Sequence, residues 1–160
     1  GRIQDTFTPV VEEHLAEYGT ELAGHTVLAD DPDRLTREIH RAVKELGAEL
    51  VICTGGMSVD PDDKTPLAIR NTGADVISYG APVLPGAMFL LAYYENAGRR
   101  IPVLGLPGCV MYAKRTIFDL VLPMLMADVE INAGQLADYG EGGLCLSCEV
   151  CTYPNCGFGK

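Results

Sequence analysis

The chain has 160 residues, and its 12 Lys and Arg against 22 Asp and Glu give a formal charge of −10. A charge of this sign argues against a general nucleic-acid binder and against a polybasic protein of the membrane surface. Hydrophobic residues make up 48% of the chain, too many for a disordered protein, yet no apolar run approaches the ~20 residues of a membrane span.

The first third of the chain predicts two helices, each followed by a strand. Thr8-Pro9 has the pattern of an N-cap followed by a proline, and the apolar periodicity after it stops at Gly19. A short apolar strand is expected over residues 25–29. A second helix starts at Asp31-Pro32 with apolar side chains at helical spacing. Residues 49–54 form a strand that is apolar on both faces, which is typical of a parallel sheet covered by helices.

The second part of the chain predicts further strands over 74–78 and 101–106 and helices over 87–96 and 110–127. We therefore expect an α/β fold, a three-layer sandwich with a mostly parallel sheet, over residues 1–130. Residues 131–160 are rich in Gly and Cys and lack apolar periodicity. They are expected to form a Cys-rich C-terminal extension that something other than a core holds in place.

Two glycine-rich turns follow predicted strands, one over 54–64 and the other over 105–109. Ligands of open parallel sheets bind beyond the carboxyl ends of the strands, and glycine lets backbone N–H groups approach an anion closely. An acidic chain can therefore still bind a small anion. The alternative is that Gly55-Gly56 merely turns the chain. Neither turn has the P-loop or the dinucleotide-binding spacing.

Three carboxylates, Asp60, Asp62 and Asp63, stand beside Lys64 in the first turn. Carboxylates at a strand end can hold Mg²⁺ or act in acid–base chemistry. The alternative is a solvated loop that leads into a helix at Thr65.

Four cysteines, Cys145, Cys148, Cys151 and Cys156, lie within twelve residues of the extension. Without a visible secretory signal we expect a cytoplasmic protein, and there clustered cysteines indicate metal ligands before disulfides. The spacing predicts a Zn²⁺ site or an Fe–S cluster. The alternative is a reduced, disordered tail or one crosslinked during purification.

Three motifs in order resemble those of the molybdopterin-binding domain of molybdenum-cofactor biosynthesis proteins, which include adenylyltransferases and molybdotransferases. They are Thr54-Gly55-Gly56-Met57-Ser58 with Asp63, then Leu84-Pro85-Gly86, then Gly105-Leu106-Pro107-Gly108. The resemblance covers roughly residues 1–127. It implies that the chain binds molybdopterin or a related pterin anion.

The resemblance also implies roles for single residues. Asp63 is the catalytic candidate, linked to molybdate insertion and to metal or nucleotide handling. The implied cofactor-binding residues are Asp5, Thr6, Thr54, Gly55, Gly56, Met57, Ser58, Asp60, Asp62, Lys64, Pro85, Gly86, Gly105, Leu106, Pro107 and Gly108.

This chain departs from the family pattern at four positions, the first of which is Phe7, where the family commonly carries asparagine. Leu84 and Ala87 stand where molybdotransferases carry lysines, and Cys109 stands where they carry asparagine. The family's leading strand would precede Gly1. We therefore expect a divergent member, a fragment that follows an N-terminal region of its parent protein, and a homodimer or homotrimer as in the family.

Three functions are then open. The first is pterin binding in molybdenum-cofactor biosynthesis, with molybdate insertion as the reaction if the chain is an enzyme. The second is a non-catalytic sensor or carrier whose Cys tail binds metal. The third is a hydrolase of nucleotide-type pyrophosphates on the same domain.

Overall fold

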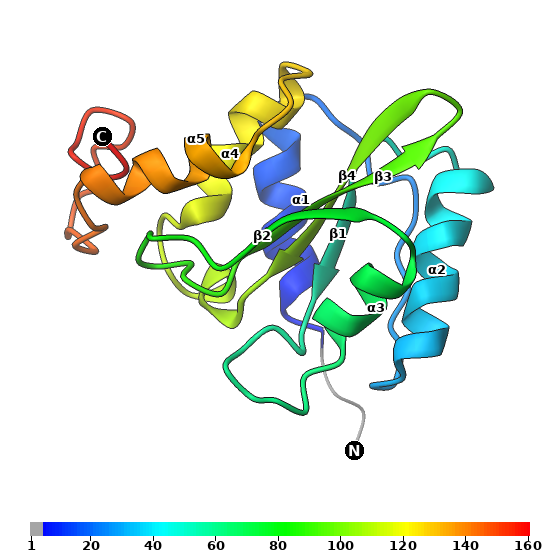
Figure 1. Cartoon of the computed structure of the whole chain (residues 1–160). Coiled ribbons are helices and arrows are strands. Elements are labelled where there is room, and N and C mark those ends of the chain that lie inside the picture. The colour runs from blue at the N-terminus through cyan, green and yellow to red at the C-terminus, as the bar shows by residue number, and fades with distance from the viewer. Residues whose placement is uncertain (1–4) are drawn as a thin grey trace.

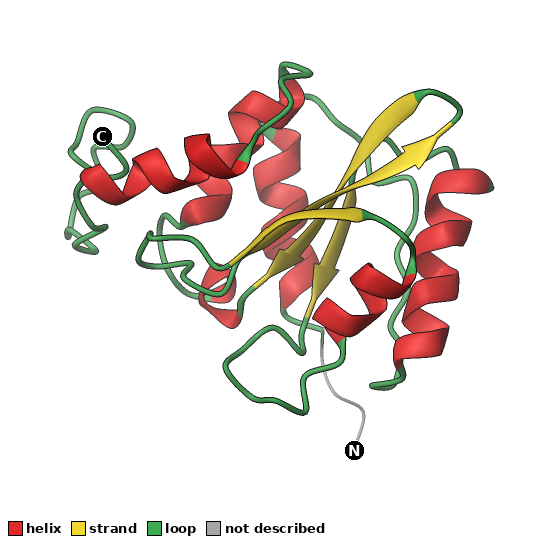
Figure 2. Cartoon of the chain, in the orientation of Figure 1, coloured by secondary structure: helices red, strands yellow, loops and turns green. Residues whose placement is uncertain are grey.

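A mixed sheet of four strands lies between two layers of helices in the computed structural model, which describes residues 5–160 (Figures 1 and 2). The strands are β1 (Val51–Thr54), β2 (Asp75–Tyr79), β3 (Leu90–Asn96) and β4 (Arg99–Leu106). The helices are α1 (Phe7–Ala16), α2 (Pro32–Lys44), α3 (Thr65–Asn71), α4 (Ile117–Met126) and α5 (Ala133–Asp138), with short 3-10 turns η1 (Gly108–Met111) and η2 (Tyr139–Glu141).

The alternation of side chains in the sheet divides the core into two parts. In β3, Leu91 and Tyr93 pack with α1 and α4, whereas Leu90 and Ala92 pack with Ile39 of α2 and its neighbour α3. This two-sided burial is the three-layer arrangement that the α/β prediction anticipated.

The prediction of a mostly parallel sheet is wrong. The strand order is β1-β4-β3-β2, in which only β1 and β4 pair in parallel while β3 is antiparallel to both of its neighbours. The predicted helix over 87–96 is also wrong, because most of that segment forms the strand β3. The two-residue turn Ala97-Gly98, with φ of 51° and 79°, joins β3 to β4 as a hairpin.

The predicted strand over 25–29 does not form, and this segment is irregular in the structure. A strand requires a partner, and β1, the nearest edge of the sheet, pairs only with β4 among the described residues. The predicted helix over 110–127 is divided into η1 and α4, because Thr116 caps α4 in a capping box with Asp119. The predicted start of the second helix is confirmed, since Asp31 accepts hydrogen bonds from two N–H groups of its first turn.

The C-terminal segment packs against α4 and the sheet. Ile131, Leu136 and Phe158 are buried in the larger part of the core, and Asn132 caps α5. Lys114 donates to the carbonyl of Cys148 at 2.6 Å, and the Tyr153 hydroxyl donates to the carbonyl of Asp119 at 2.9 Å. These contacts attach residues 131–160 to the rest of the fold.

Replacing Tyr153 by phenylalanine is expected to destabilise the fold by about 1 kcal/mol, because the variant loses one hydrogen bond but keeps the ring. The ring itself carries the guanidinium of Arg115 at 4.9 Å. Urea titration measures the loss, and limited proteolysis should show earlier cleavage within residues 142–157. An unchanged unfolding midpoint and cleavage rate would show that this hydroxyl does not hold the segment.

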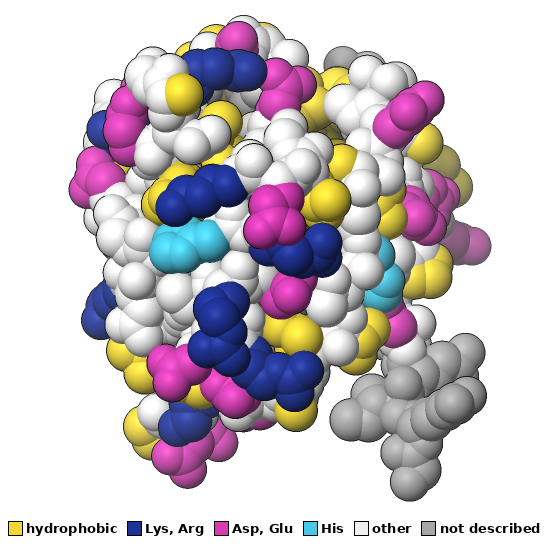
Figure 3. Space-filling model, turned by 90° about the vertical axis from the view of Figure 1, so that its right-hand side faces the viewer, with side chains coloured by type: hydrophobic (Ala, Val, Ile, Leu, Met, Phe, Trp, Pro, Cys, Tyr) yellow, Lys and Arg dark blue, Asp and Glu magenta, His cyan; other side chains and the backbone are white. Residues whose placement is uncertain are grey.

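Charges of both signs are interspersed on the face that α2 and α3 present (Figure 3). Arg34 and Arg41 of α2, for example, lie in the same helix as Asp33 and Glu38, and Arg41 pairs with Glu38 at 2.8 Å. No helix among residues 5–160 combines the length and the apolar character needed to cross a membrane.

Candidate functional site

The carboxyl ends of three strands lie at the same edge of the sheet. Thr54 at the end of β1 is the register partner of Leu106 at the end of β4. Leu90 at the start of β3 pairs with both Gly105 of β4 and Tyr79 at the end of β2. The turns that follow these strands therefore open at one edge, although the sheet is mixed. We call it the carboxyl edge.

The loop after β1 turns sharply at Gly55 and Gly56, whose φ values are 77° and 55°. The Thr65 hydroxyl at the start of α3 donates to the carbonyl of Gly55 at 2.8 Å and fixes this turn. A Cβ on Gly56 would lie 3.1 Å from the same hydroxyl oxygen. Both the backbone conformation and the space therefore favour glycine.

The rest of this loop is held by its own side chains. The Asp63 carboxylate accepts the N–H of Ser58, and the Ser58 hydroxyl accepts the N–H of Asp60 at 3.2 Å. Asp60 in turn accepts the N–H of Asp62 at 2.9 Å. The hydroxyl of Tyr79 donates to the Ser58 carbonyl at 3.1 Å and connects the loop to β2. The structure therefore brings these predicted residues together, with Asp63 as the residue that folds the loop back.

Some predicted binding residues have their side chains in the core. Met57 is only 3% exposed and packs on Gly105, where a Cβ would lie 2.6 Å from the Met57 methyl carbon. Leu106 is fully buried. Of these residues only the backbone can face a ligand. Pro107 and Gly108 follow and lead into η1, and no hydrogen-bond partner is present within residues 5–160 for the N–H of Gly56 or of Gly108.

The start of α1 lies at the same edge. The Thr6 hydroxyl contacts the sulfur of Met111 in η1 at 2.9 Å. Asp5 accepts the N–H groups of Phe7 and Thr8, and its other oxygen lies 3.0 Å from Nε2 of His25. The hydrogen bonds from Thr8, foremost that of its hydroxyl, lower the pKa of Asp5. Sequence reasoning missed His25, since a single histidine with no ligand spacing carries no signal.

The Pro85-Gly86 turn is anchored to α4. The carbonyl of Pro85 accepts the N–H of Ile117 at 3.0 Å, and Gly86 has φ of 128°. Leu84 is 52% exposed and Ala87 is also exposed. The two positions at which molybdotransferases carry lysines are therefore at the surface. Cys109 is half-buried, and burial raises the pKa of its thiol.

The predicted metal sites find no support in this structure. Among residues 5–160, no three His, Cys, Asp or Glu side chains come together as a possible ligand group. Cys148, Cys151 and Cys156 are exposed free thiols, while Cys145 is half-buried against the core. The three carboxylates of the loop do not converge either, because Asp60 and Asp63 accept backbone N–H groups of the loop itself. The residues thus do not fit Zn²⁺, an Fe–S cluster or Mg²⁺ held by protein ligands alone.

Comparison with known proteins relates this chain to molybdopterin-binding domains. A family model described as "Probable molybdopterin binding domain" matches residues 1–127. The molybdenum cofactor biosynthesis bifunctional protein of Synechococcus elongatus is 32% identical over 71 residues, which are 44% of this chain and 22% of that protein. The molybdopterin molybdenumtransferase of the same organism is 28% identical over 128 residues, or 79% of this chain and 31% of that protein.

A putative competence-damage inducible protein of Bacillus velezensis is 35% identical over 72 residues, or 45% of this chain and 17% of that protein. The chain therefore spans between 17% and 31% of the length of these relatives. Among solved structures, the molybdopterin biosynthesis enzyme MoaB of Thermus thermophilus superposes with a TM-score of 0.58 at 22% identity, covering 82% of this chain and 87% of MoaB. That likeness concerns the fold.

Proposed function

The chain belongs to the family of molybdopterin-binding domains found in molybdenum-cofactor biosynthesis proteins, and from this we propose that its carboxyl edge binds the phosphate end of molybdopterin. The observation that carries the proposal is the meeting of the Gly55-Gly56 turn and the Pro107-Gly108 turn at the ends of neighbouring strands β1 and β4. Two glycine turns side by side present backbone donors to one anion.

Backbone N–H groups have to supply most of the binding, because Leu84 and Ala87 replace the family's lysines. The N–H groups of Gly56 and Gly108, which have no hydrogen-bond partner among residues 5–160, are the donors that we assign to the phosphate. Lys64 is the cation nearest to the glycine turn in sequence, and its ammonium lies 3.9 Å from the exposed Asp62 carboxylate. Because this ion pair with Asp62 is long and exposed, it is weak, and the Lys64 side chain can turn toward an anion.

Asp63 is the residue that we propose for catalysis. Its carboxylate closes the loop over residues 58–63 through the N–H of Ser58. An anionic ligand that takes this N–H would free the carboxylate to accept a proton during the reaction. Insertion of molybdate, as the name of one relative suggests, is the reaction that we propose for this arrangement.

Two other functions remain as competing proposals, and no contact or relative described above favours either of them. A sensor or carrier with a metal-binding tail would need ligands that the described residues do not bring together. A pyrophosphate hydrolase would use the same edge on another substrate, and no relative named above carries that activity in its name. Cytoplasmic location and a homodimer or homotrimer also remain predictions.

The proposed reaction is tested by turnover of adenylated molybdopterin with molybdate in the chain and in the variant Asp63→Asn. The variant preserves the shape of the side chain and an oxygen for the N–H of Ser58. We expect it to keep pterin binding and to lose turnover about 100-fold or more, in the range of general acid–base catalysis. Binding without turnover in the unaltered chain would favour a carrier, and turnover of a simple dinucleotide instead would favour the hydrolase.

Replacing Lys64 by alanine is expected to weaken molybdopterin binding about tenfold, since one charged hydrogen bond contributes roughly 1.5–3 kcal/mol and solvent screening reduces it. The matched control is Arg37→Ala, which removes one positive charge from the exposed surface of α2. Equilibrium titration by fluorescence measures both. Equal affinities for Lys64→Ala and Arg37→Ala would exclude a direct contact of Lys64 with the ligand.

A further inference from the structure

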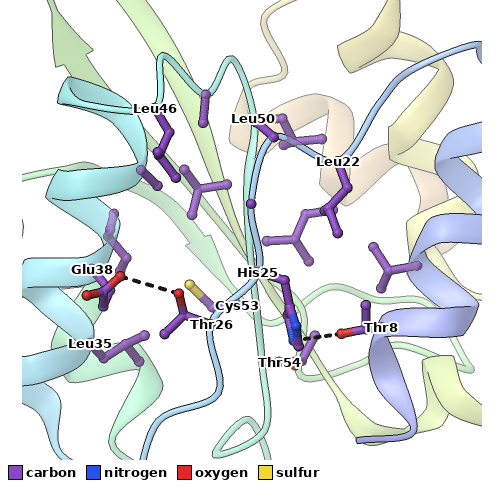
Figure 4. Close-up of a pocket in the computed structure, with 18 of the residues that line it drawn as sticks. Thr8, Leu22, His25, Thr26, Leu35, Glu38, Leu46, Leu50, Cys53 and Thr54 are labelled. Carbon is purple, nitrogen blue, oxygen red and sulfur yellow. Dashed lines mark hydrogen bonds between the residues drawn. The ribbon is translucent and has the colours of Figure 1, made fainter.

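The outer part of the loop after β1 has few contacts with the rest of the fold. Residues 58–62 are exposed, and most hydrogen bonds of this loop are made by its own side chains. On the side of α1, Thr54 lies near His25 and Thr8, but the hydrogen bond there joins His25 to Thr8 and does not reach the loop (Figure 4). The contact that fixes the outer loop relative to the sheet therefore comes from another side.

Two contacts beside Ser58 join the loop to the sheet. Met57 is buried and packs on β4. Tyr79 at the end of β2 donates its hydroxyl to the Ser58 carbonyl at 3.1 Å. Among residues 5–160, Tyr79 is the only residue outside the loop that hydrogen-bonds any of residues 57–63. The position of Ser58 therefore depends on Met57 from the core and on Tyr79 from the surface.

Tyr79 is suited to be a permanent donor. A carbonyl oxygen can only accept, so the phenol has to supply the proton of this hydrogen bond. Burial, with a smaller contribution from the Asp63 carboxylate, raises the pKa of Tyr79 above its ordinary value of 10.0. The hydroxyl therefore stays protonated at physiological pH and keeps its hydrogen bond to Ser58.

Side chains hold both backbone groups of Ser58. Its N–H donates to Asp63, and its C=O accepts from Tyr79. In the proposed function, the anion takes this N–H and the bond to Asp63 is lost. The bond from Tyr79 can persist, because it uses the carbonyl on the other side of the residue. Tyr79 is thus the contact that can keep the Ser58 N–H in place while a ligand is bound.

We infer that Tyr79 is a positioning residue of the carboxyl edge, which holds Ser58 so that its N–H faces the bound anion. The inference rests on the proposed function, because it concerns the same ligand at the same edge. Without the hydroxyl, the ligand has to order the loop as it binds, and this ordering reduces the affinity. Tyr79 acts through Ser58 in this role and not by contact with the reacting atoms.

The variant Tyr79→Phe tests the inference, because it removes only the hydroxyl. The matched control is Tyr94→Phe in β3, which pairs with Ile101 toward the hairpin end of the sheet. The Tyr94 side chain packs with His40 and Lys44, and its hydroxyl is not used in any hydrogen bond of the described chain. Molybdopterin titration, urea unfolding and amide exchange by NMR are followed in the unaltered chain and in both variants.

We expect Tyr79→Phe to bind molybdopterin about three- to tenfold more weakly, which is the effect of one hydrogen bond. In the chain without ligand, the N–H groups of Ser58, Asp60 and Asp62 should exchange at least threefold faster. In the turnover assay with molybdate, the apparent KM for molybdopterin should rise by a larger factor than kcat falls, because bound ligand restores the loop. A merely structural contact would lower the urea midpoint without this split. Tyr94→Phe should match the unaltered chain in affinity and in loop exchange.

Three results would overturn the inference. Equal affinities of Tyr79→Phe and Tyr94→Phe, in a chain that binds molybdopterin, would mean that Ser58 needs no support from β2. Faster amide exchange without a loss of affinity would leave Tyr79 as a structural contact of the loop only. If the unaltered chain shows no saturable molybdopterin binding, the proposed function itself fails, and the role of Tyr79 in binding fails with it.

Discussion

Replacing Asp119 by alanine is expected to lower the free energy of unfolding by about 3–5 kcal/mol. The Asp119 side chain is 3% exposed, and its carboxylate lies 2.6 Å from the guanidinium of Arg115 and 3.3 Å from Nδ1 of His14. It also accepts the N–H of Thr116 at 2.7 Å at the start of α4. The alanine variant leaves all three donors without their acceptor in a largely buried place, which costs more than an exposed ion pair contributes.

Urea denaturation followed by circular dichroism measures this loss. The matched control is Asp33→Ala, an exposed carboxylate in the first turn of α2, where we expect a change within about 0.5 kcal/mol. Similar losses in the two variants would show that the network around Asp119 adds nothing beyond a helix-end charge.

The same network makes stability depend on pH. Burial raises the pKa of Asp119, but the hydrogen bonds from His14 and Arg115 outweigh it, so the net shift is downward. The hydrogen bond to Asp119 raises the pKa of His14 above its ordinary 6.5. A raised pKa means that the charged His14 stabilises the fold fully below pH 6.5, and that this contribution is lost as the pH rises through the folded pKa. In the Asp119→Ala variant this part of the pH dependence should disappear.

Replacing Gly86 by alanine is expected to destabilise the fold by about 2–5 kcal/mol, through backbone strain and overpacking together. An alanine at φ of 128° is strained by about 1–3 kcal/mol. Its Cβ would also lie 2.3 Å from the Cγ2 atom of Ile117 and 3.0 Å from the Ile117 backbone nitrogen, so the turn or α4 has to move. Overpacking of this kind costs typically about 1–3 kcal/mol.

The control for this prediction is Gly98→Ala in the β3–β4 turn. Gly98 also has a positive φ, 79°, but a Cβ there would meet no atom within 4 Å. The Gly98→Ala variant should therefore lose only the free energy of the backbone strain, about 1 kcal/mol. Thermal unfolding of both variants separates the two contributions, and equal melting temperatures would mean that Ile117 does not press on Gly86.

The sequence could predict those parts of the fold that depend on residues close together in the chain. Asp31 caps α2 as its spacing indicates, and β1 and β4 are apolar strands that end in glycine turns. The helix predicted over 87–96 fails because Leu90 to Tyr93 are buried on both faces of the sheet, and a run without alternation does not distinguish a helix from a buried strand. The signal for the hairpin was the two-residue turn at Ala97-Gly98.

The rest depends on contacts between residues far apart in sequence. His14 of α1 and Asp119 of α4 are far apart in the sequence, so no local pattern connects them. The predicted strand over 25–29 is apolar enough, but pairing decides strands and the described chain gives it no partner. Likewise, the spacing of Cys145, Cys148, Cys151 and Cys156 suited a metal, whereas Phe158 and Tyr153 pack their segment against α4 and the thiols stay apart.

Our main proposal is that molybdopterin binds at the carboxyl edge through glycine N–H groups. Two-dimensional ¹H–¹⁵N NMR of the labelled chain, titrated with molybdopterin under anaerobic conditions, tests it without any assumption about turnover. We expect the largest saturable shifts at Gly55, Gly56 and Gly108, with small shifts at the distant turn residue Gly98. Absence of saturable shifts, or shifts confined to residues away from the turns after β1 and β4, would contradict this binding site.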